Sequence, residues 1–461
     1  MQEPLPQTEE RATTRRPIDP AGAGRPGELL RLAAPIVVST ASSSLMSVVD
    51  TAFAGRLGPT EVAAVGLAGV LVWVPYALLN GTLSSVNTFV AQRFGAGDLP
   101  GCVRFTWQGL YLVTLGALPA LALAVFASPL YSSLTSADVA PLAALYTRIR
   151  VFAVWAFSFV MVFEGFWRGM GDTRTPMRIT VAANLLNVVA TYMLMFGPFG
   201  LPRLGVAGAA WGTLLAQGSA LAAHVWLFLR APRRHGLPTL PPLLPSAEPI
   251  RRLLWVGVPV GVTWLLDMGS YAVFTIYVGT FGTTALAVTT IVVQIQSLSF
   301  MQMIAVGQAG TTLVGQYIGA GRKDIAMRSG ISALRVGALY GIAVGLLLLA
   351  TREHLIGLFN RDPDVVQLGG VILLYSAAMQ LFDGVWIVAG GALRGAGDTR
   401  FSLWCGIIVA WLLFLPLAYG LGSGIGLGLH GAWTAMVVWA VVGAAVHVPR
   451  FLLGTWQRIS I

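Results

Sequence analysis

The stretch Arg168-Gly-Met-Gly-Asp-Thr-Arg174 returns as Arg394-Gly-Ala-Gly-Asp-Thr-Arg400, with six of seven residues identical at an offset of 226. Three more motif pairs recur in the same order at an offset of 223 or 224, and these are Ala34-Pro35 with Val258-Pro259, Gln92-x-x-Gly95-Ala96-Gly97 with Gln316-x-x-Gly319-Ala320-Gly321, and Leu204-Gly205-x-x-Gly208-Ala209 with Leu427-Gly428-x-x-Gly431-Ala432. Four motifs at nearly one spacing, close to half the chain length, indicate two related halves.

The composition is that of a membrane protein. Only 10% of the 461 residues are charged and the mean hydropathy is +0.75, whereas soluble domains carry roughly 25% charged residues. The apolar runs are long and continuous, which favours membrane-spanning helices over the short alternating strands of a barrel. The net charge of +10 is therefore interpreted as basic residues held at one membrane face, and we expect no nucleic-acid partner.

Twelve apolar segments are predicted as membrane helices, at residues 29–53, 62–92, 104–127, 141–167, 176–198, 205–230, 252–278, 284–317, 327–351, 365–393, 401–421 and 428–452. The predicted fold class is an all-α integral membrane protein with twelve transmembrane helices in two pseudo-symmetric six-helix bundles. The repeat offset spans six helices, an even number, so both halves enter the membrane from the same side. We expect the chain to divide into a disordered cytoplasmic tail, an N-lobe, a basic and Pro-rich linker and a C-lobe, at residues 1–27, 28–230, 231–250 and 251–454.

The distribution of Lys and Arg predicts the orientation. With the N-terminus in the cytoplasm, 23 of the 29 basic residues lie on the cytoplasmic side, and six lie outside, namely Arg56, Arg148, Arg150, Arg203, Arg352 and Arg361. We therefore expect a multi-pass protein of the cell membrane with both termini in the cytoplasm. Residues 1–27 lack the features of a cleavable signal peptide, so the first apolar segment is expected to be retained.

The repeated heptapeptide is interpreted as a stiff intracellular corner, with contact to a phosphate or lipid headgroup as the alternative. Its glycines permit a tight turn, and Asp172 and Asp398 are expected to cap the following helix or to pair with the adjacent arginine. Cys102 and Cys405 stand far apart in unlike surroundings, which indicates neither a disulfide nor a metal site.

Acidic residues inside the apolar segments are the sharper signal. Four lie well inside predicted helices, and these are Asp50, Glu164, Asp267 and Asp383. A charge at the bilayer centre costs at least about 2.5–3.5 kcal/mol, so such residues usually face a hydrated cavity or a partner. For Asp50, Asp267 and Asp383 we favour binding of a coupling H⁺ or Na⁺ over an interhelical hydrogen bond. Glu164 lies one helical turn before Arg168, so an ion pair explains it better.

Asn184, Asn187 and Thr191 give one polar face to an apolar helix, for which interhelical hydrogen bonding and a functional role are both open. No arrangement typical of a catalytic site is visible, and we expect no enzymatic activity. No nucleotide-binding motif is present either, so we do not expect ATP-driven transport by this chain alone.

These residues resemble a known family, the multidrug and toxic compound extrusion (MATE) transporters. The resemblance covers about residues 28–452 and rests on Pro35, Met46-Ser-Val-Val-Asp50-Thr-Ala-Phe-Ala-Gly55 and the repeated motifs quoted above. It implies two six-helix lobes around a central cleft that work by alternating access. It also implies export of small organic, often cationic, compounds in exchange for H⁺ or Na⁺, with no other cofactor.

The resemblance also suggests residue roles. Asp50 and Asn187 match the family's cation site in the N-lobe, and Tyr146 and Thr213 fall where that lobe contributes further polar groups. Thr191 replaces an aspartate that one branch of the family has. Asp267 and Asp383 match acidic positions in the C-lobe of another branch, so the chain combines features of both. Any Na⁺ would bind at these coupling residues, and no other metal is expected.

Two further readings stay open beside a secondary antiporter. A flippase for lipid-linked precursors would need a cationic cavity, whereas the basic residues here are predicted at the ends of helices. An intramembrane enzyme should show a nucleophile–base or metal-binding arrangement, and none is visible in the sequence. A non-transporting scaffold has no need for three isolated carboxylates. The expected partners are a small organic substrate and membrane lipids, and we expect a monomer.

Overall fold

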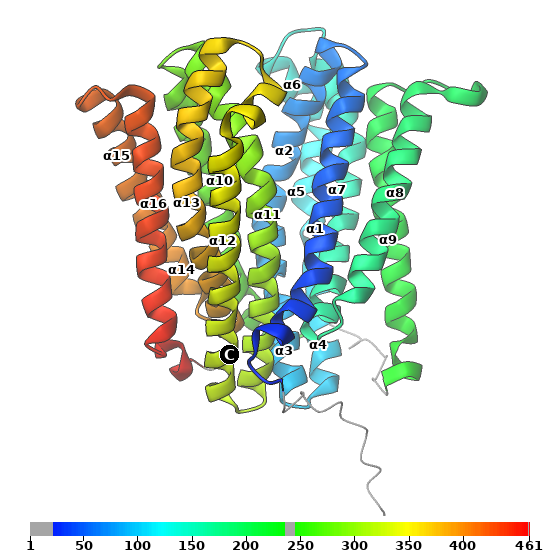
Figure 1. Cartoon of the computed structure of the whole chain (residues 1–461). Coiled ribbons are helices and arrows are strands. Elements are labelled where there is room, and N and C mark those ends of the chain that lie inside the picture. The colour runs from blue at the N-terminus through cyan, green and yellow to red at the C-terminus, as the bar shows by residue number, and fades with distance from the viewer. Residues whose placement is uncertain (1–21, 236–244, 460) are drawn as a thin grey trace, which may run out of the picture.

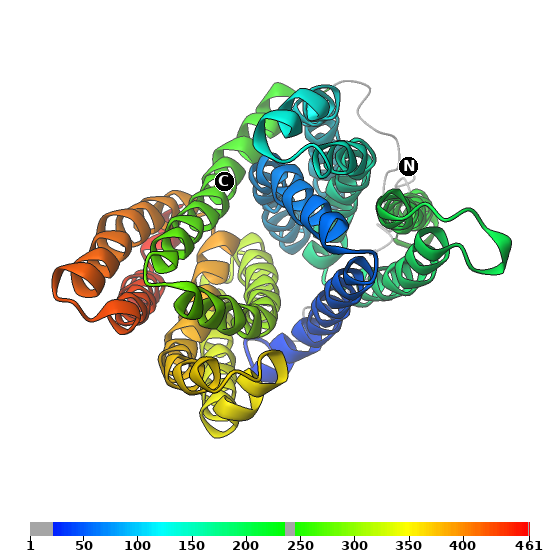
Figure 2. The same cartoon turned by 90° about the horizontal axis from the view of Figure 1, so that it is seen from above.

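The computed structural model describes residues 22–235, 245–459 and 461, and within them the chain forms helices and turns but no strand. The helices are α1 Pro26–Gly55, α2 Pro59–Leu83, α3 Ser85–Gly95, α4 Leu99–Leu115, α5 Ala117–Val125, α6 Ala127–Leu134, α7 Ala140–Gly169, α8 Arg174–Phe196, α9 Val206–His235, α10 Ala247–Gly279, α11 Thr283–Gly319, α12 Lys323–Phe359, α13 Pro363–Gly395, α14 Thr399–Gly406, α15 Leu415–Tyr419 and α16 Gly428–Leu452. They form two bundles side by side, one from α1–α9 and one from α10–α16 (Figures 1 and 2).

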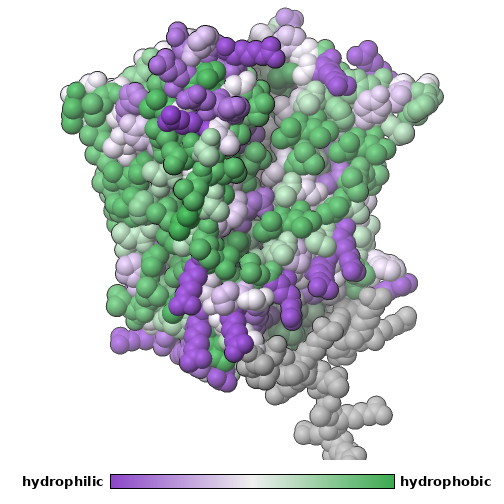
Figure 3. Space-filling model, viewed as in Figure 1, coloured by the Kyte–Doolittle hydropathy of each residue, from purple (hydrophilic) through white to green (hydrophobic). Residues whose placement is uncertain are grey.

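The predicted fold class is confirmed. Eleven segments of the described chain are long and apolar enough to cross a membrane. The predicted third span is present as two shorter helices, α4 and α5, which meet at Gly116. In the space-filling view, apolar residues cover the middle of the visible face and hydrophilic residues gather toward its two ends (Figure 3).

Several predicted helices differ in detail. The segment predicted as one helix over 104–127 starts earlier, breaks at Gly116 and is followed by the short helix α6. The segment at 401–421 contains two π-helical stretches, Ile407–Phe414 and Gly420–Gly424. The helix predicted at 327–351 extends in both directions to Lys323–Phe359, because the charged residues at its ends continue the helix beyond the apolar run.

Local sequence accounts for many helix ends. Pro26 and Pro59 lie in the first turn of α1 and α2, where the missing N–H of proline costs nothing. Asp98 caps α4 by accepting a hydrogen bond of 2.8 Å from the backbone N–H of Gly101. Helix α8 ends at Gly197, which has a φ of 64°, a conformation that favours glycine.

Both ends of the described chain lie at the same end of the bundles, at the bottom of Figure 1, and we call this the inner end. The two repeated heptapeptides lie there, between α7 and α8 and between α13 and α14. Asp172 caps α8 by accepting hydrogen bonds from the backbone N–H groups of Arg174 and Thr175 at 3.2 and 3.1 Å. The expectation for Asp398 is wrong. It makes no capping bond and accepts instead from Nε of Arg450 on α16 at 2.9 Å, a partner that lies 52 residues away in the sequence.

The ion pair predicted for Glu164 is confirmed. Glu164 pairs with Arg168 at 2.7 Å, and Cys102 and Cys405 are free and buried. The predicted tail at 1–27 falls mostly on residues 1–21, and the predicted linker at 231–250 includes residues 236–244. Those parts of both predictions lie outside the described residues.

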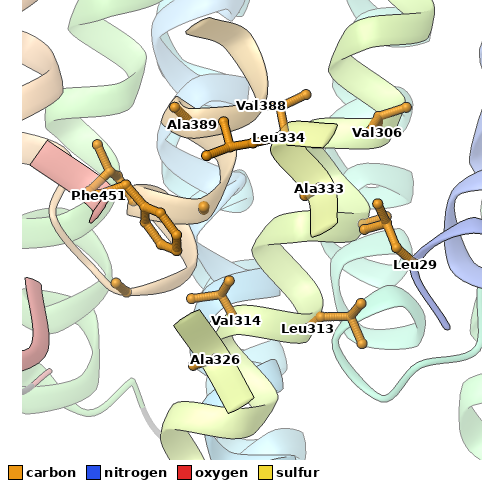
Figure 4. Packing of buried hydrophobic residues seen from close by; sticks show 14 of the residues in the cluster. Leu29, Val306, Leu313, Val314, Ala326, Ala333, Leu334, Val388, Ala389 and Phe451 are labelled. Atoms are coloured by element: carbon orange, nitrogen blue, oxygen red, sulfur yellow. The ribbon is translucent and has the colours of Figure 1, made fainter. Parts of the chain in front are cut away.

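The first helix of each half begins inside the core of the other half. Leu29, Ala33 and Ile36 of α1 belong to a buried cluster whose other members come from α11, α12, α13 and the C-terminal segment (Figure 4). Their counterpart in the C-lobe, Leu253 of α10, is buried together with residues of α3, α4 and α7. Leu29 and Leu253 are related by the repeat offset of 224, so the exchange is symmetric and ties the two lobes together at the inner end.

Candidate functional site

Helices α1 and α8 place the polar residues of the N-lobe at matching heights. Both helices run from the inner end outward, and Nδ2 of Asn184 donates to the hydroxyls of Ser42 and Ser43 at 2.9 and 3.2 Å. Two helical turns further along α1 comes Asp50, and two turns further along α8 comes Thr191. Residues seven or eight apart share one face of a helix, and every α-helix rises by the same length per residue. Counted from the contact of Asn184 with Ser42 and Ser43, Asp50 and Thr191 therefore lie at the same height, on the sides of α1 and α8 that face each other. Contacts of Phe53 with Tyr192 and Phe196 extend this register outward.

Two polar atoms at this level have no partner within the described part of the chain. Oδ1 of Asp50 and Nδ2 of Asn187 are both buried and without a hydrogen bond. Asn187 uses its carbonyl oxygen to accept from the hydroxyl of Thr191 at 3.2 Å. Buried polar groups are normally satisfied, so this set of α1 and α8 atoms has binding capacity left for a ligand or for water.

Arg150 is a member of this interior that the sequence analysis placed outside the membrane. It lies ten residues into α7, which corresponds to about 15 Å along the helix. Its Nη1 atom is buried without a partner in the described chain, and its positive charge acts on Asp50. The sequence did place Arg150 inside a predicted helix, which was the available signal that it lies in the interior. Its partner Asp50 lies on another helix, 100 residues earlier in the sequence, so the pairing could not be predicted. The N-lobe interior therefore holds one carboxylate and one guanidinium.

The C-lobe brings Asp267 and Asp383 into one interior. Asp267 and Tyr271 are one turn apart on α10, and Asp383 on α13 is close enough for its charge to act on the phenol of Tyr271. Asp383 is only 5% exposed. Within the described residues neither carboxylate makes a hydrogen bond or an ion pair shorter than 4 Å, which sets them apart from the paired Glu164.

Arg394 is the cation of this second interior, and the repeat explains why. Its counterpart Arg168 is neutralised by Glu164, but the residue equivalent to Glu164 at the offset of 226 is Gly390. The Arg394 side chain turns back along α13, so that a Cβ atom added to Gly390 would lie 3.5 Å from its Nη1. The charge of Arg394 acts on Asp267. Arg394 does not act on Asp383, so the C-lobe interior holds two carboxylates and one guanidinium that serves only Asp267.

The remaining predicted residues lie in the N-lobe with less direct involvement. Tyr146 on α7 and Thr213 on α9 are both buried, and the hydroxyl of Thr213 donates to the carbonyl of Ala209 in its own helix at 3.1 Å. The predicted site residues therefore form two separate groups, one around Asp50 in the N-lobe and one around Asp267 and Asp383 in the C-lobe.

Both groups are built around carboxylates that make no ion pair within the described residues. The described residues contain no cluster of three or more His, Cys, Asp or Glu side chains that could hold a metal ion. A lone carboxylate in an apolar surrounding can take up a proton or provide oxygen ligands to Na⁺.

Comparison with known proteins identifies the family of the chain. The family model MatE matches residues 35–193 and 259–420, which are equivalent parts of the two halves. The chain is 32% identical over 438 residues to the multidrug resistance protein NorM of Burkholderia vietnamiensis, covering 93% of this chain and 94% of that protein. It is 28% identical to a probable multidrug resistance protein NorM of Thermotoga maritima, with 94% of each chain covered.

Solved structures show the same fold. A multidrug resistance MATE family transporter of the MOP superfamily, solved in an outward-facing conformation, superposes with a TM-score of 0.84 at 23% identity, covering 95% of this chain and 96% of the other. The eukaryotic MATE transporter AtDTX14 superposes with a TM-score of 0.84 at 19% identity, with 94% and 96% covered.

Proposed function

The chain belongs to the MatE family of multidrug and toxic compound extrusion transporters, and we propose that it is a secondary antiporter. It would export small organic cations across the cell membrane in exchange for H⁺ or Na⁺, with the inner end in the cytoplasm. The observation that carries this proposal is the pair of carboxylates in the C-lobe interior, Asp267 and Asp383, of which only Asp267 is acted on by the guanidinium of Arg394. The names of the similar proteins, which are multidrug resistance proteins, support the class of cargo.

We propose that the C-lobe couples the ion to the cargo. A cation entering this lobe meets one negative charge in excess, whereas in the N-lobe Arg150 already offsets Asp50. Antiport requires that the ion bind the two conformations with different affinity, because a ligand that binds both equally shifts no population. Helices α10 and α13, which carry the two carboxylates, both reach the seam between the lobes at the inner end, so their relative position can change with the conformation.

Aromatic side chains in the same lobe suit a flat cationic cargo. Trp386 and Trp439 lie edge to face at 4.8 Å between ring centroids, and Phe414 stacks on Trp439. The indole N–H groups of Trp411 and Trp439 are buried without a partner in the described chain. Aromatic faces attract organic cations, so ion and cargo would compete for one negatively charged lobe, which is a simple basis for exchange.

Transport by the purified protein in liposomes tests this function. Vesicles loaded with ethidium are given an inward H⁺ gradient, an inward Na⁺ gradient or a K⁺ gradient of equal size, with the membrane potential clamped. We expect dye efflux that one of the first two gradients accelerates and the K⁺ gradient does not. Equal efflux under all three gradients would contradict ion-coupled antiport, and scrambling of a fluorescent anionic lipid without dye efflux would favour a flippase.

Arg150 provides a second prediction. Replacing it with glutamine removes the charge that offsets Asp50, so the N-lobe gains an uncompensated carboxylate and a second place for the ion. We expect the ion concentration for half-maximal efflux to fall on the order of five-fold, within the usual range of coupling energies. The double variant R150Q/D50N is the control and should return to the value of D50N alone. If R150Q changes the ion concentration for half-maximal efflux neither with Asp50 present nor with D50N, the charge of Arg150 does not affect ion binding in the N-lobe.

A further inference from the structure

The repeated motif Gln-x-x-Gly-Ala-Gly joins the two lobes at the inner end. Nε2 of Gln92, in α3 of the N-lobe, donates to the carbonyl of Gly395 in the C-lobe at 3.0 Å. Nε2 of Gln316, in α11 of the C-lobe, donates to the carbonyl of Gly169 in the N-lobe at 2.8 Å. Gly169 and Gly395 are the second residues of the repeated heptapeptides. Each copy of one motif is thus bonded to the opposite copy of the other.

The backbones of α3 and α11 meet in the same reciprocal way. A Cβ atom on Gly95 would overlap the carbonyl of Gln316, and one on Gly319 would overlap the carbonyl of Gln92. Between these contacts, a Cβ atom on Gly315 would lie 2.9 Å from Cβ of Ala91, and these two residues are each other's equivalents at the offset of 224. In a two-fold interface a residue on the axis meets its own counterpart, so the axis that relates the lobes passes here.

Further hydrogen bonds between the lobes extend this seam. The Thr88 hydroxyl donates to the Arg394 carbonyl at 3.1 Å, and the hydroxyl of its repeat counterpart Thr312 donates to Oδ1 of Asn87 at 3.2 Å. Within the described chain the outermost hydrogen bond between the lobes is that of Thr40 with Gln302, near the middle of α1 and α11. Toward the opposite end the helices spread apart (Figure 1), so the lobes are held together on one side only.

We infer that Gln92 and Gln316 are gating residues that hold the inner side of the transporter closed. This inference rests on the proposed function, since it takes the inner end as the cytoplasmic side and alternating access as the mechanism. The two bonds are equivalent under the axis, so one rotation of the lobes breaks both and also separates Ala91 from Gly315. They join a neutral amide to a backbone carbonyl, so the closed gate does not depend on ion pairs that salt would screen.

A cross-link across the axis tests whether this seam must open. In a background with Cys102 and Cys405 replaced by alanine, A91C/G315C places two cysteines at the axis, where a small shift gives the usual Cβ separation of about 3.8 Å. We expect the oxidised protein to lose dye efflux and the reduced protein to regain it. Oxidised protein that forms the cross-link and still transports at the rate of the reduced protein would overturn the inference.

Labelling of a buried cysteine tests the role of the glutamines without any transport. Ala91 is fully buried in the closed seam, so in inside-out vesicles A91C reacts with an impermeant maleimide only when the gate opens. Q92A and Q316A should each raise the labelling rate roughly five-fold, as expected for one net hydrogen bond. Q294A, at an exposed position of α11, is the matched control. If Q92A and Q316A label no faster than Q294A, the glutamines do not hold the gate.

The two experiments separate the gate from the proposed function. If the reduced protein transports no dye under either ion gradient, the antiporter proposal fails. The labelling rates then still decide whether Gln92 and Gln316 keep the inner seam closed.

Discussion

Replacing Asp267 and Asp383 together with asparagine is expected to lower ion-driven dye efflux at least about ten-fold, which corresponds to about 1.4 kcal/mol of lost coupling energy. The double variant removes both carboxylates of the C-lobe and leaves the charge of Arg394 uncompensated there. The interior then carries a net positive charge, which repels both the driving cation and a cationic cargo. Efflux from liposomes under the driving gradient measures this effect, and dye binding by fluorescence anisotropy measures the cargo affinity.

The controls assign the coupling to one lobe. D364N removes a carboxylate from an exposed position at the start of α13, the same helix that carries Asp383, and should leave efflux unchanged. D50N should have a smaller effect than the double variant, because Arg150 already offsets that carboxylate. Full loss of efflux in D50N together with normal efflux in D267N/D383N would place the coupling in the N-lobe instead.

The fold could be predicted from the sequence because its main signals are local or repeated. Apolar runs give the helices, and four motif pairs give the two halves and their parallel relation. What the sequence missed depends on contacts between distant segments. That Leu79 of α2 lies against the backbone of Gly116 is such a contact. The break of the third span at Gly116 also has a local cause, because Pro119 has no N–H to bond the carbonyl of Leu115.

The candidate site was predicted in part for the same reason. Asp267 and Asp383 stood out because a carboxylate in an apolar run is unusual at its own position. Arg150 and Arg394 were missed as members of the two interiors. Arg394 lies at the end of its helix and Arg150 a third of the way along its own, and only the packing shows which way each side chain turns. Gln92 and Gln316 were noted as markers of the repeat. The repeat offset of 224 shows that the two motifs are equivalent, but it does not predict that they contact each other in the fold.

Replacing Gly341 with leucine is expected to destabilise the C-lobe by about 1–3 kcal/mol or more, the range for overpacked interiors. Gly337, Gly341 and Gly345 recur at every fourth residue of α12 and form one stripe against α13. A Cβ atom on Gly341 would overlap the carbonyl of Gln380, which is backbone and cannot rotate away. Helices α12 and α13 must therefore separate, and Asp383, three residues after Gln380, moves with them.

Gly357 provides a matched control on the same helix, since a Cβ atom there would have no neighbour within 4 Å. G357L gains the same improvement in helix propensity, roughly 1 kcal/mol, without the clash, so its stability should equal or exceed that of the unaltered protein. Both variants are heated in detergent, and the fraction that stays monodisperse on size-exclusion chromatography at each temperature gives the midpoint of thermal unfolding. Equal midpoints for G341L and G357L would mean that α12 and α13 do not approach as closely as the glycine stripe indicates.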